Sequence, residues 1–84
     1  MDATTLIGIV GAAVILLAFL LNQKGKVTAE SNLYDGLNAL GSLLLVVYAV
    51  LLNSIPFFIL NTVWLLVSAK GLLENKENNN EKQP

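Results

Sequence analysis

The sequence of 84 residues contains no cysteine, no histidine and no arginine, and charged residues make up only 13% of it. Without cysteine the chain has no disulfides, no thiol chemistry and no thiolate ligands for a metal. Its net charge of −1 leaves no basic surface of the kind that binds nucleic acid. We therefore expect no nucleic-acid partner, no bound metal and no cofactor.

The few charged side chains are missing altogether from two long stretches. No Asp, Glu, Lys, Arg or His occurs from Ala3 to Gln23 or from Gly36 to Ala69, and hydrophobic residues make up 55% of the chain. Helices formed by these stretches are apolar on all sides, which suits a protein core or lipid. The remaining residues are too few to build a core around them. The sequence thus predicts an integral membrane protein with the lipid bilayer as its surroundings.

The second stretch is too long for a single crossing of the bilayer, which takes about 20 residues. The break is best placed at Asn53-Ser54-Ile55-Pro56, because Asn and Ser favour turns and proline is tolerated in the first turn of a helix. We expect an all-α membrane protein whose residues 1–73 form a transmembrane domain, a triple-helix bundle of three transmembrane helices. The spans are predicted at about 6–21, 36–52 and 55–73.

The ends of these helices also carry signals. Thr4 or Thr5 is placed to cap the first helix, and Asn32 followed by Asp35 has the spacing of a capping box for the second. Residues 74–84 offer nothing to bury, so we expect a disordered tail there.

The lysines predict how the chain is oriented in the membrane. Three crossings put the linker 22–31 and the C-terminal tail on the same side. All the lysines fall on that side; they are Lys24, Lys26, Lys70, Lys76 and Lys82. Because lysine and arginine concentrate in cytoplasmic segments, we expect the N-terminus outside and the C-terminus in the cytoplasm.

Neutral polar and aromatic residues inside the spans are the candidate site residues. Asn38 and Tyr48 share a stripe of the second helix, and Asn61 and Trp64 share a stripe of the third. Counting the helical rise from the turn places Tyr48 level with Asn61, and Trp64 level with Ser42. A broken polar column through the bilayer is the resulting prediction.

A purely structural interpretation stays open for each of these residues. Asn61 suits a link between helices, and Trp64 suits plain packing or lipid contact. The Tyr48 hydroxyl can point to the outer interface, and Asn38 can be wetted at the cytoplasmic side.

The spans hold no paired carboxylates and no nucleophile with a histidine base, so we do not expect an enzyme. They also hold no acid or histidine for a proton relay, so any solute movement is expected to be passive.

Residues 6–73 resemble the SemiSWEET half-transporters of the PQ-loop family. The resemblance lies in Ile7-Gly8, in Phe19-Leu20-Leu21-Asn22 where that family has Phe-Leu-Pro-Gln, in Tyr48-Ala49, and in Pro56 followed by Asn61. The family's pocket tryptophan falls at Leu45, while Trp64 lies one turn from Asn61.

The chain is also similar to a group of small bacterial three-span proteins, some described as permeases. The shared pattern reads Leu6-Ile7-Gly8, Asn38-Ala39-Leu40-Gly41 and Leu60-Asn61-Thr62-Val63-Trp64. This similarity implies a bacterial inner (plasma) membrane as the location.

The resemblance to SemiSWEET proteins implies a parallel homodimer that facilitates the movement of a small polar solute. Its site would comprise Asn61, Trp64, Tyr48 and Asn38 from both copies, and two copies would give six helices around a central axis. The alternative hypothesis is a membrane interaction or regulatory subunit without transport activity, whose stripes bind the spans of a partner.

Overall fold

Three α-helices make up the fold of residues 2–28 and 31–82, which are the residues that the computed structural model describes. They are α1 (Ala3–Gln23), α2 (Asn32–Leu52) and α3 (Ile55–Lys82), joined without any strand in this part of the chain. Ala3–Gln23, Asn32–Leu52 and Ile55–Glu74 are each long and apolar enough to cross a membrane. The predicted all-α architecture with three membrane-spanning helices is confirmed.

The two caps differ from those predicted. Asp2, in extended backbone with ψ 170°, accepts a hydrogen bond from the backbone N–H of Thr5 at 2.9 Å. Ser31, with ψ 150°, accepts one from the backbone N–H of Tyr34 at 3.1 Å. A capping residue needs this extended backbone, whereas Thr4, Thr5 and Asn32 are already helical. Each of the two helices therefore begins at or before the residue that the sequence offered as its cap.

The break between α2 and α3 lies where the sequence places it. Asn53 ends α2 in the left-handed region, with φ 59° and ψ 38°, and asparagine tolerates this region better than most residues. The backbone N–H of Ser54 donates to the carbonyl oxygen of Ala49 at 2.9 Å, which closes the end of α2. Pro56 then occupies the first turn of α3, where its missing N–H is not needed.

At its C-terminal end α3 extends into the segment for which a disordered tail is predicted. The backbone continues as helix through Lys82, beyond the apolar part that ends at Glu74. Residues 74–82 contain neither glycine nor proline, so nothing in them stops a helix that the apolar part has already nucleated. Residues 83 and 84, the end of the predicted tail, lie outside the described residues.

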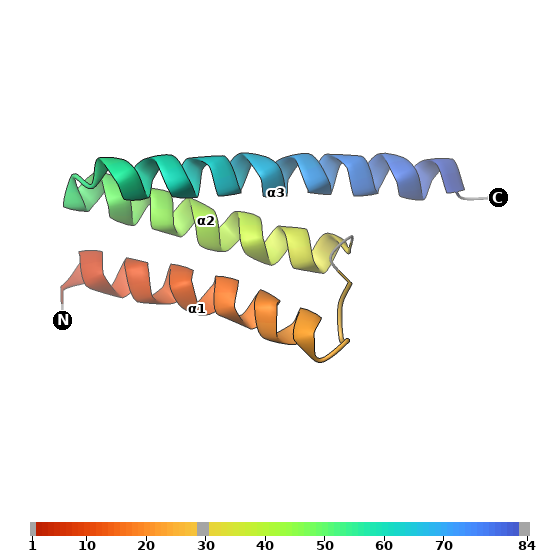
Figure 1. The fold of residues 1–84 in the computed structure, drawn as a ribbon, viewed down its shortest axis with the longest axis horizontal. Coiled ribbons are helices and arrows are strands. Elements are labelled where there is room, and N and C mark those ends of the chain that lie inside the picture. Colours follow the sequence, from red (N-terminus) through yellow and green to blue (C-terminus); the bar gives the residue numbers. More distant parts are fainter. Residues whose placement is uncertain (1, 29–30, 83–84) are drawn as a thin grey trace.

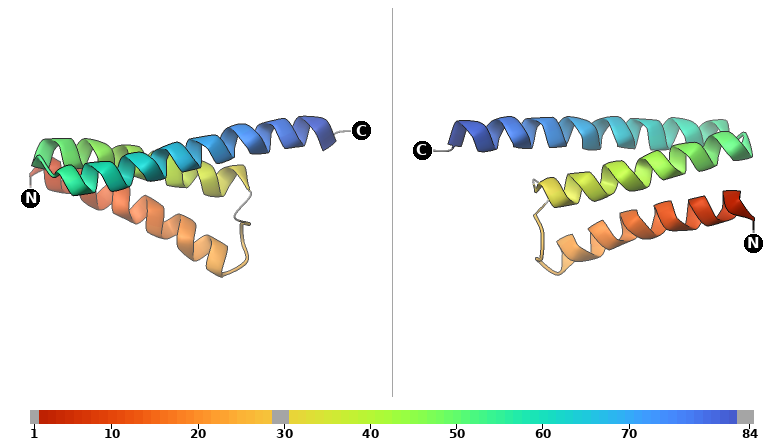
Figure 2. Two further views of the ribbon diagram at one scale, coloured as in Figure 1. Left: turned by 45° about the horizontal axis from the view of Figure 1, so that its top comes forward. Right: turned by 180° about the vertical axis from the view of Figure 1, so that it is seen from behind.

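The three helices lie in a row with α2 in the middle (Figure 1). Both α1 and α3 pack against α2, and among the described residues no Cα of α1 comes within 8 Å of a Cα of α3. In Figure 2, α1 diverges from the other two helices towards its C-terminal end. The triple-helix bundle is therefore open between its first and third helices.

Glycines set the contact between α1 and α2. A Cβ atom on Gly41 would lie 2.5 Å from Cγ1 of Ile15 and 2.9 Å from the carbonyl oxygen of Gly11. Towards the N-terminal end of α1, a Cβ atom on Gly8 would lie 2.6 Å from the ring of Tyr48. Small residues allow two helix backbones to approach this closely in a membrane, where packing rather than hydrophobicity joins helices.

We expect Gly41→Ala to destabilise the fold by about 1–3 kcal/mol, because the new methyl group meets both a side chain and a backbone oxygen of α1. Thermal unfolding in detergent micelles, followed by circular dichroism, measures the change. Gly36→Ala is the matched control in the same helix, since no atom lies within 4 Å of its added Cβ. The control should gain up to about 1 kcal/mol from helix propensity. Equal stabilities of the two variants would contradict this account of the α1–α2 contact.

Candidate functional site

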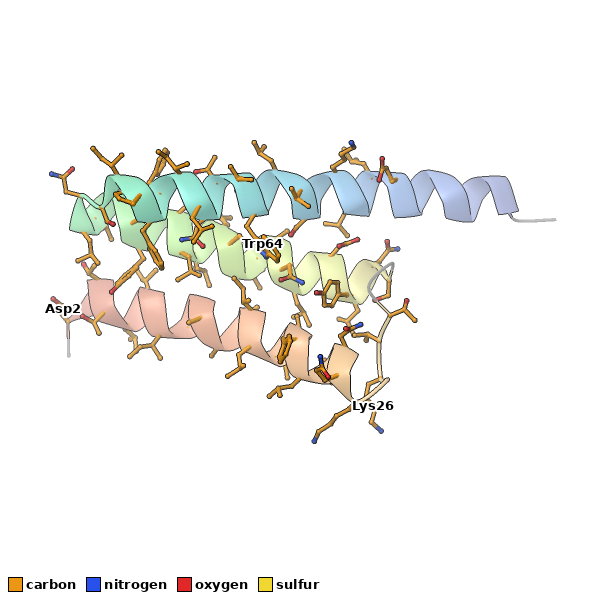
Figure 3. The ribbon with its side chains drawn as sticks, in the orientation of Figure 1. Asp2, Lys26 and Trp64 are labelled. Carbon is orange, nitrogen blue, oxygen red and sulfur yellow. The ribbon has the colours of Figure 1, made fainter. Side chains whose placement is uncertain are left out.

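Two of the predicted site residues join α2 to α3. The indole Nε1–H of Trp64 donates a hydrogen bond to Oδ1 of Asn38 at 3.1 Å. The Asn38 side chain, only 4% exposed, also donates through Nδ2 to the carbonyl oxygen of Tyr34 at 2.9 Å. Figure 3 shows the Trp64 side chain on the side of α3 that faces α2. Asn38 is thus the residue that links helices, a role that the sequence offered for Asn61.

The side chain of Asn61 is turned back on its own helix. It is 5% exposed, and its Nδ2 donates to the carbonyl oxygen of Phe57, four residues earlier, at 2.9 Å. Within the described residues, its Oδ1 atom accepts no hydrogen bond. The carboxamide therefore keeps an acceptor that the fold itself does not use.

Tyr48 lies apart from Asn38 and Trp64, towards the turn between α2 and α3. Its ring covers Gly8 of α1 and meets the ring of Phe57 of α3 edge to face, with centroids 6.1 Å apart and planes at 75°. Such an aromatic pair contributes about 0.5–1.5 kcal/mol beyond its buried area. Tyr48, itself part of α2, thereby contacts both α1 and α3 at this end, which indicates a packing role.

The side-chain pairs differ from those that the predicted layers suggest. Tyr48 lies against Phe57 instead of Asn61, and Trp64 bonds to Asn38 instead of Ser42. In both pairs the observed partner is displaced from the predicted one by four residues. Counting the rise alone assumes that α2 and α3 begin level at the turn, and it ignores how the turn offsets one helix against the other.

A cavity of about 280 Å³ lies where the three helices meet. The side chains that line it come from every helix; they are Ile15, Leu45, Phe57, Leu60, Asn61 and Trp64. Of the four predicted site residues, only Asn61 and Trp64 line this cavity, and the others that line it are apolar. Sequence reasoning missed Ile15, Phe57 and Leu60, because apolar residues in an apolar span carry no signal of their own.

Among the described residues, two buried hydroxyl groups in the membrane-spanning part have no hydrogen-bond partner. They are Oγ of Ser42, whose residue is fully buried, and Oγ1 of Thr62. Neither residue lines the cavity. They add no polar surface to it, so the cavity presents a single carboxamide and one indole among apolar groups.

The residues that line the cavity supply apolar side chains, one indole and one carboxamide. Among residues whose side chains the structure describes, no group of three His, Cys, Asp or Glu residues lies close enough to hold a metal ion. Outside the spans, hydrogen bonds from Thr5 lower the pKa of the Asp2 carboxyl, which therefore stays ionised as the cap of α1. Dispersion, stacking and hydrogen bonding are what the cavity offers to a ligand.

A protein-family model matches residues 4–79, which is most of the chain and covers all three helices except Ala3 and residues 80–82. No curated protein and no solved structure shows significant similarity to this chain.

We expect Asn38→Leu to lower the stability by about 1–2 kcal/mol, because it leaves the indole N–H of Trp64 without its partner in an apolar medium. Trp64 is the single tryptophan of the chain, so its fluorescence emission reports the change directly alongside circular dichroism. Ser42→Ala is the control, since the deleted hydroxyl has no partner; its stability should stay the same or rise. A stable Asn38→Leu variant with unchanged emission would show that the bond is not made.

Proposed function

Because the chain belongs to the uncharacterised family whose model matches residues 4–79, and its spans hold no reactive groups, we propose that it acts by association within the membrane. In this proposal it is an interaction or regulatory subunit, and the element that recognises its partner is the cavity between the three helices. The proposal assigns it no catalytic activity.

The observation that carries this proposal is the chemistry of the cavity. Five of its six lining residues are Ile, Leu, Phe or Trp, and the amide of Asn61 already donates to Phe57. A hydroxyl-rich solute would leave most of its polar groups unpaired here, at a cost of about 1–3 kcal/mol for each. Apolar side chains of a neighbouring helix carry no such penalty, so the cavity suits a helix better than a polar solute.

The same proposal includes a location and an orientation. We place the protein in a bacterial inner membrane on its similarity to small bacterial three-span proteins. We orient it with its N-terminus outside and its C-terminus in the cytoplasm on the distribution of its lysines. The arrangement of the helices supports an odd number of crossings, since Asp2 and Lys26 lie at opposite ends of α1 and the two termini lie at opposite ends of the molecule (Figures 1 and 3).

A second candidate function is passive transport of a small polar solute by a parallel homodimer of the SemiSWEET type. It is favoured by one observation, namely that Asn61 and Trp64 line the same cavity. If it is correct, proteoliposomes should take up glucose faster than protein-free liposomes, and Asn61→Ala should abolish the difference while the dimer survives. Our main proposal expects no glucose uptake above that of protein-free liposomes. Stopped-flow light scattering under a glucose gradient measures the rate of uptake by the proteoliposomes and by the protein-free liposomes.

Photo-crosslinking in native membranes tests the main proposal. We expect Leu60→p-benzoylphenylalanine to form a crosslinked product with a polypeptide, because Leu60 borders the cavity. Ile59 is a matched control: it is the adjacent residue of α3, it is 56% exposed against 60% for Leu60, and it does not line the cavity. The same substitution at Ile59 should crosslink lipid alone. Polypeptide products of equal yield from both positions, or none from Leu60, would refute the assignment of the cavity.

A further inference from the structure

The loop that follows α1 lies where the lipid headgroups begin. Between Asp2 and Lys24, the nearest charged residues on either side, α1 is an uncharged helix of 21 residues. At a rise of about 1.5 Å per residue it is about 31 Å long, which matches the thickness of the hydrocarbon core. Asp2 is therefore level with the headgroups of one leaflet, and Lys24 and Lys26 are level with those of the other.

Hydrogen bonds tie this loop to the end of α1. The backbone N–H of Lys26 donates to the carbonyl oxygen of Leu21 at 2.9 Å. The side chain of Asn22 donates through Nδ2 to the carbonyl oxygen of Val27 at 3.1 Å. The backbone that carries Lys24 and Lys26 is therefore held by bonds that span the loop.

Both lysines are exposed, and the space between them is open. They flank Gly25, which has a positive φ of 74°, and no atom lies within 4 Å of a Cβ atom built on it. Figure 3 shows Lys26 at the C-terminal end of α1, which diverges from the other two helices (Figure 2). An anion can therefore reach both ammonium groups from outside the helix row.

The acidic groups near this end leave the loop positive. The oxygens of the Asp35 carboxylate lie against Gly71, so this carboxylate is on the α3 side of α2, whereas the lysines are at the end of α1. The linker 22–31 itself carries two lysines and a single acid, Glu30, which lies outside the described residues. The linker thus has a net positive charge.

An apolar stripe of α1 runs from Lys24 into the membrane. Leu20 and Leu17 precede Lys24 by four and seven residues, so all three lie on one face of the helix. The two leucines are 44% and 48% exposed, and neither lines the cavity between the three helices. This face therefore presents positive charge at headgroup depth and apolar surface directly beneath it.

A phospholipid with a net negative headgroup has the matching chemistry. Its phosphate can accept hydrogen bonds from the two ammonium groups while an acyl chain lies along Leu20 and Leu17. A zwitterionic lipid offers the same chain, but the lysines repel the positive group of its headgroup. We infer that the hydrogen-bonded loop around Lys24 and Lys26, with the stripe beneath it, is a binding surface for an anionic phospholipid. This inference goes beyond the proposed function and is independent of it, because the surface shares no residue with the cavity.

Photo-crosslinking of the full-length chain in liposomes tests the inference. The liposomes contain equal amounts of phosphatidylglycerol and phosphatidylcholine with identical acyl chains, and mass spectrometry identifies the attached lipid. For Leu20→p-benzoylphenylalanine, we expect the phosphatidylglycerol product to exceed the phosphatidylcholine product at least about fivefold, because each lysine near a membrane surface contributes about that factor.

Leu6 is the matched control, because it is 53% exposed near the other end of α1, where no lysine lies. The same substitution at Leu6 should give products in the ratio of the bulk lipids. Equal product ratios at Leu20 and Leu6 would overturn the inference.

Charge substitutions in the Leu20 photo-crosslinking variant separate the loop from the net charge of the chain. Lys24→Gln combined with Lys26→Gln should return the product ratio to that of the bulk lipids. Lys76→Gln combined with Lys82→Gln removes the same two charges elsewhere in the sequence and should leave the enrichment unchanged. Equal losses in the two double variants would assign the preference to net charge alone and contradict a surface at the loop.

Asn22→Ala tests whether the loop must be held. It keeps both lysines but removes the hydrogen bond to the carbonyl oxygen of Val27, so we expect an enrichment between that of the original loop and that of the bulk lipids. An unchanged enrichment would show that the lysines act without a fixed loop, against the inference as stated. Circular dichroism of each variant confirms that the helices are retained.

Added salts distinguish a lipid headgroup from free phosphate. Sodium phosphate should weaken the enrichment no more than sodium chloride of equal ionic strength, because a free phosphate gains nothing from the apolar stripe. A stronger effect of sodium phosphate would identify the loop as a site for the soluble anion and refute the assignment to a lipid.

Discussion

The absence of water from the bilayer core is the constraint on which the rest of the structure depends. Every backbone amide there must bond within the chain, which only a continuous helix achieves over a span. The side-chain amides obey the same rule, since Asn38 and Asn61 each donate to the carbonyl oxygen four residues earlier in their own helix. This local bond lets a polar residue sit in an apolar span. For Asn38, the oxygen that this local bond leaves over accepts the indole N–H of Trp64 and so joins α2 to α3.

Helix α2 depends on this constraint most, because it has a neighbour on each side. Its contact with α1 depends on the absence of a side chain at Gly41. Its contact with α3 includes the hydrogen bond from Trp64 to Asn38 and the edge-to-face pair of Tyr48 and Phe57. Added volume disturbs the first contact, while loss of the Asn38 carboxamide weakens the second. Two different kinds of substitution are therefore needed to separate the middle helix from its two neighbours.

The sequence predicts the number of helices and the turn at Asn53 well, because these follow from where charges are absent. It fails for the register of α3 against α2. The pairing of Tyr48 with Phe57 depends on how the turn offsets the two helices, and no residue type announces that offset. It fails for the cavity for a related reason, since Ile15 and Leu60 resemble every other apolar residue of the spans. Only polar and aromatic residues stand out in such an apolar sequence. The sequence therefore points to Asn61 and Trp64, but not to the cavity around them.

The length of α3 has a mechanical consequence. Its helix passes Glu74, where the apolar part ends, and reaches Lys82, which adds roughly 12 Å of rod beyond the bilayer. Figure 1 shows this segment extending past the end of α2 with no other helix beside it. When a stiff helix is held at one end, a small rotation there moves its free end through a larger distance. Any change in the angle between α3 and α2 is therefore amplified at Lys82, so that a shift buried in lipid becomes a displacement in water.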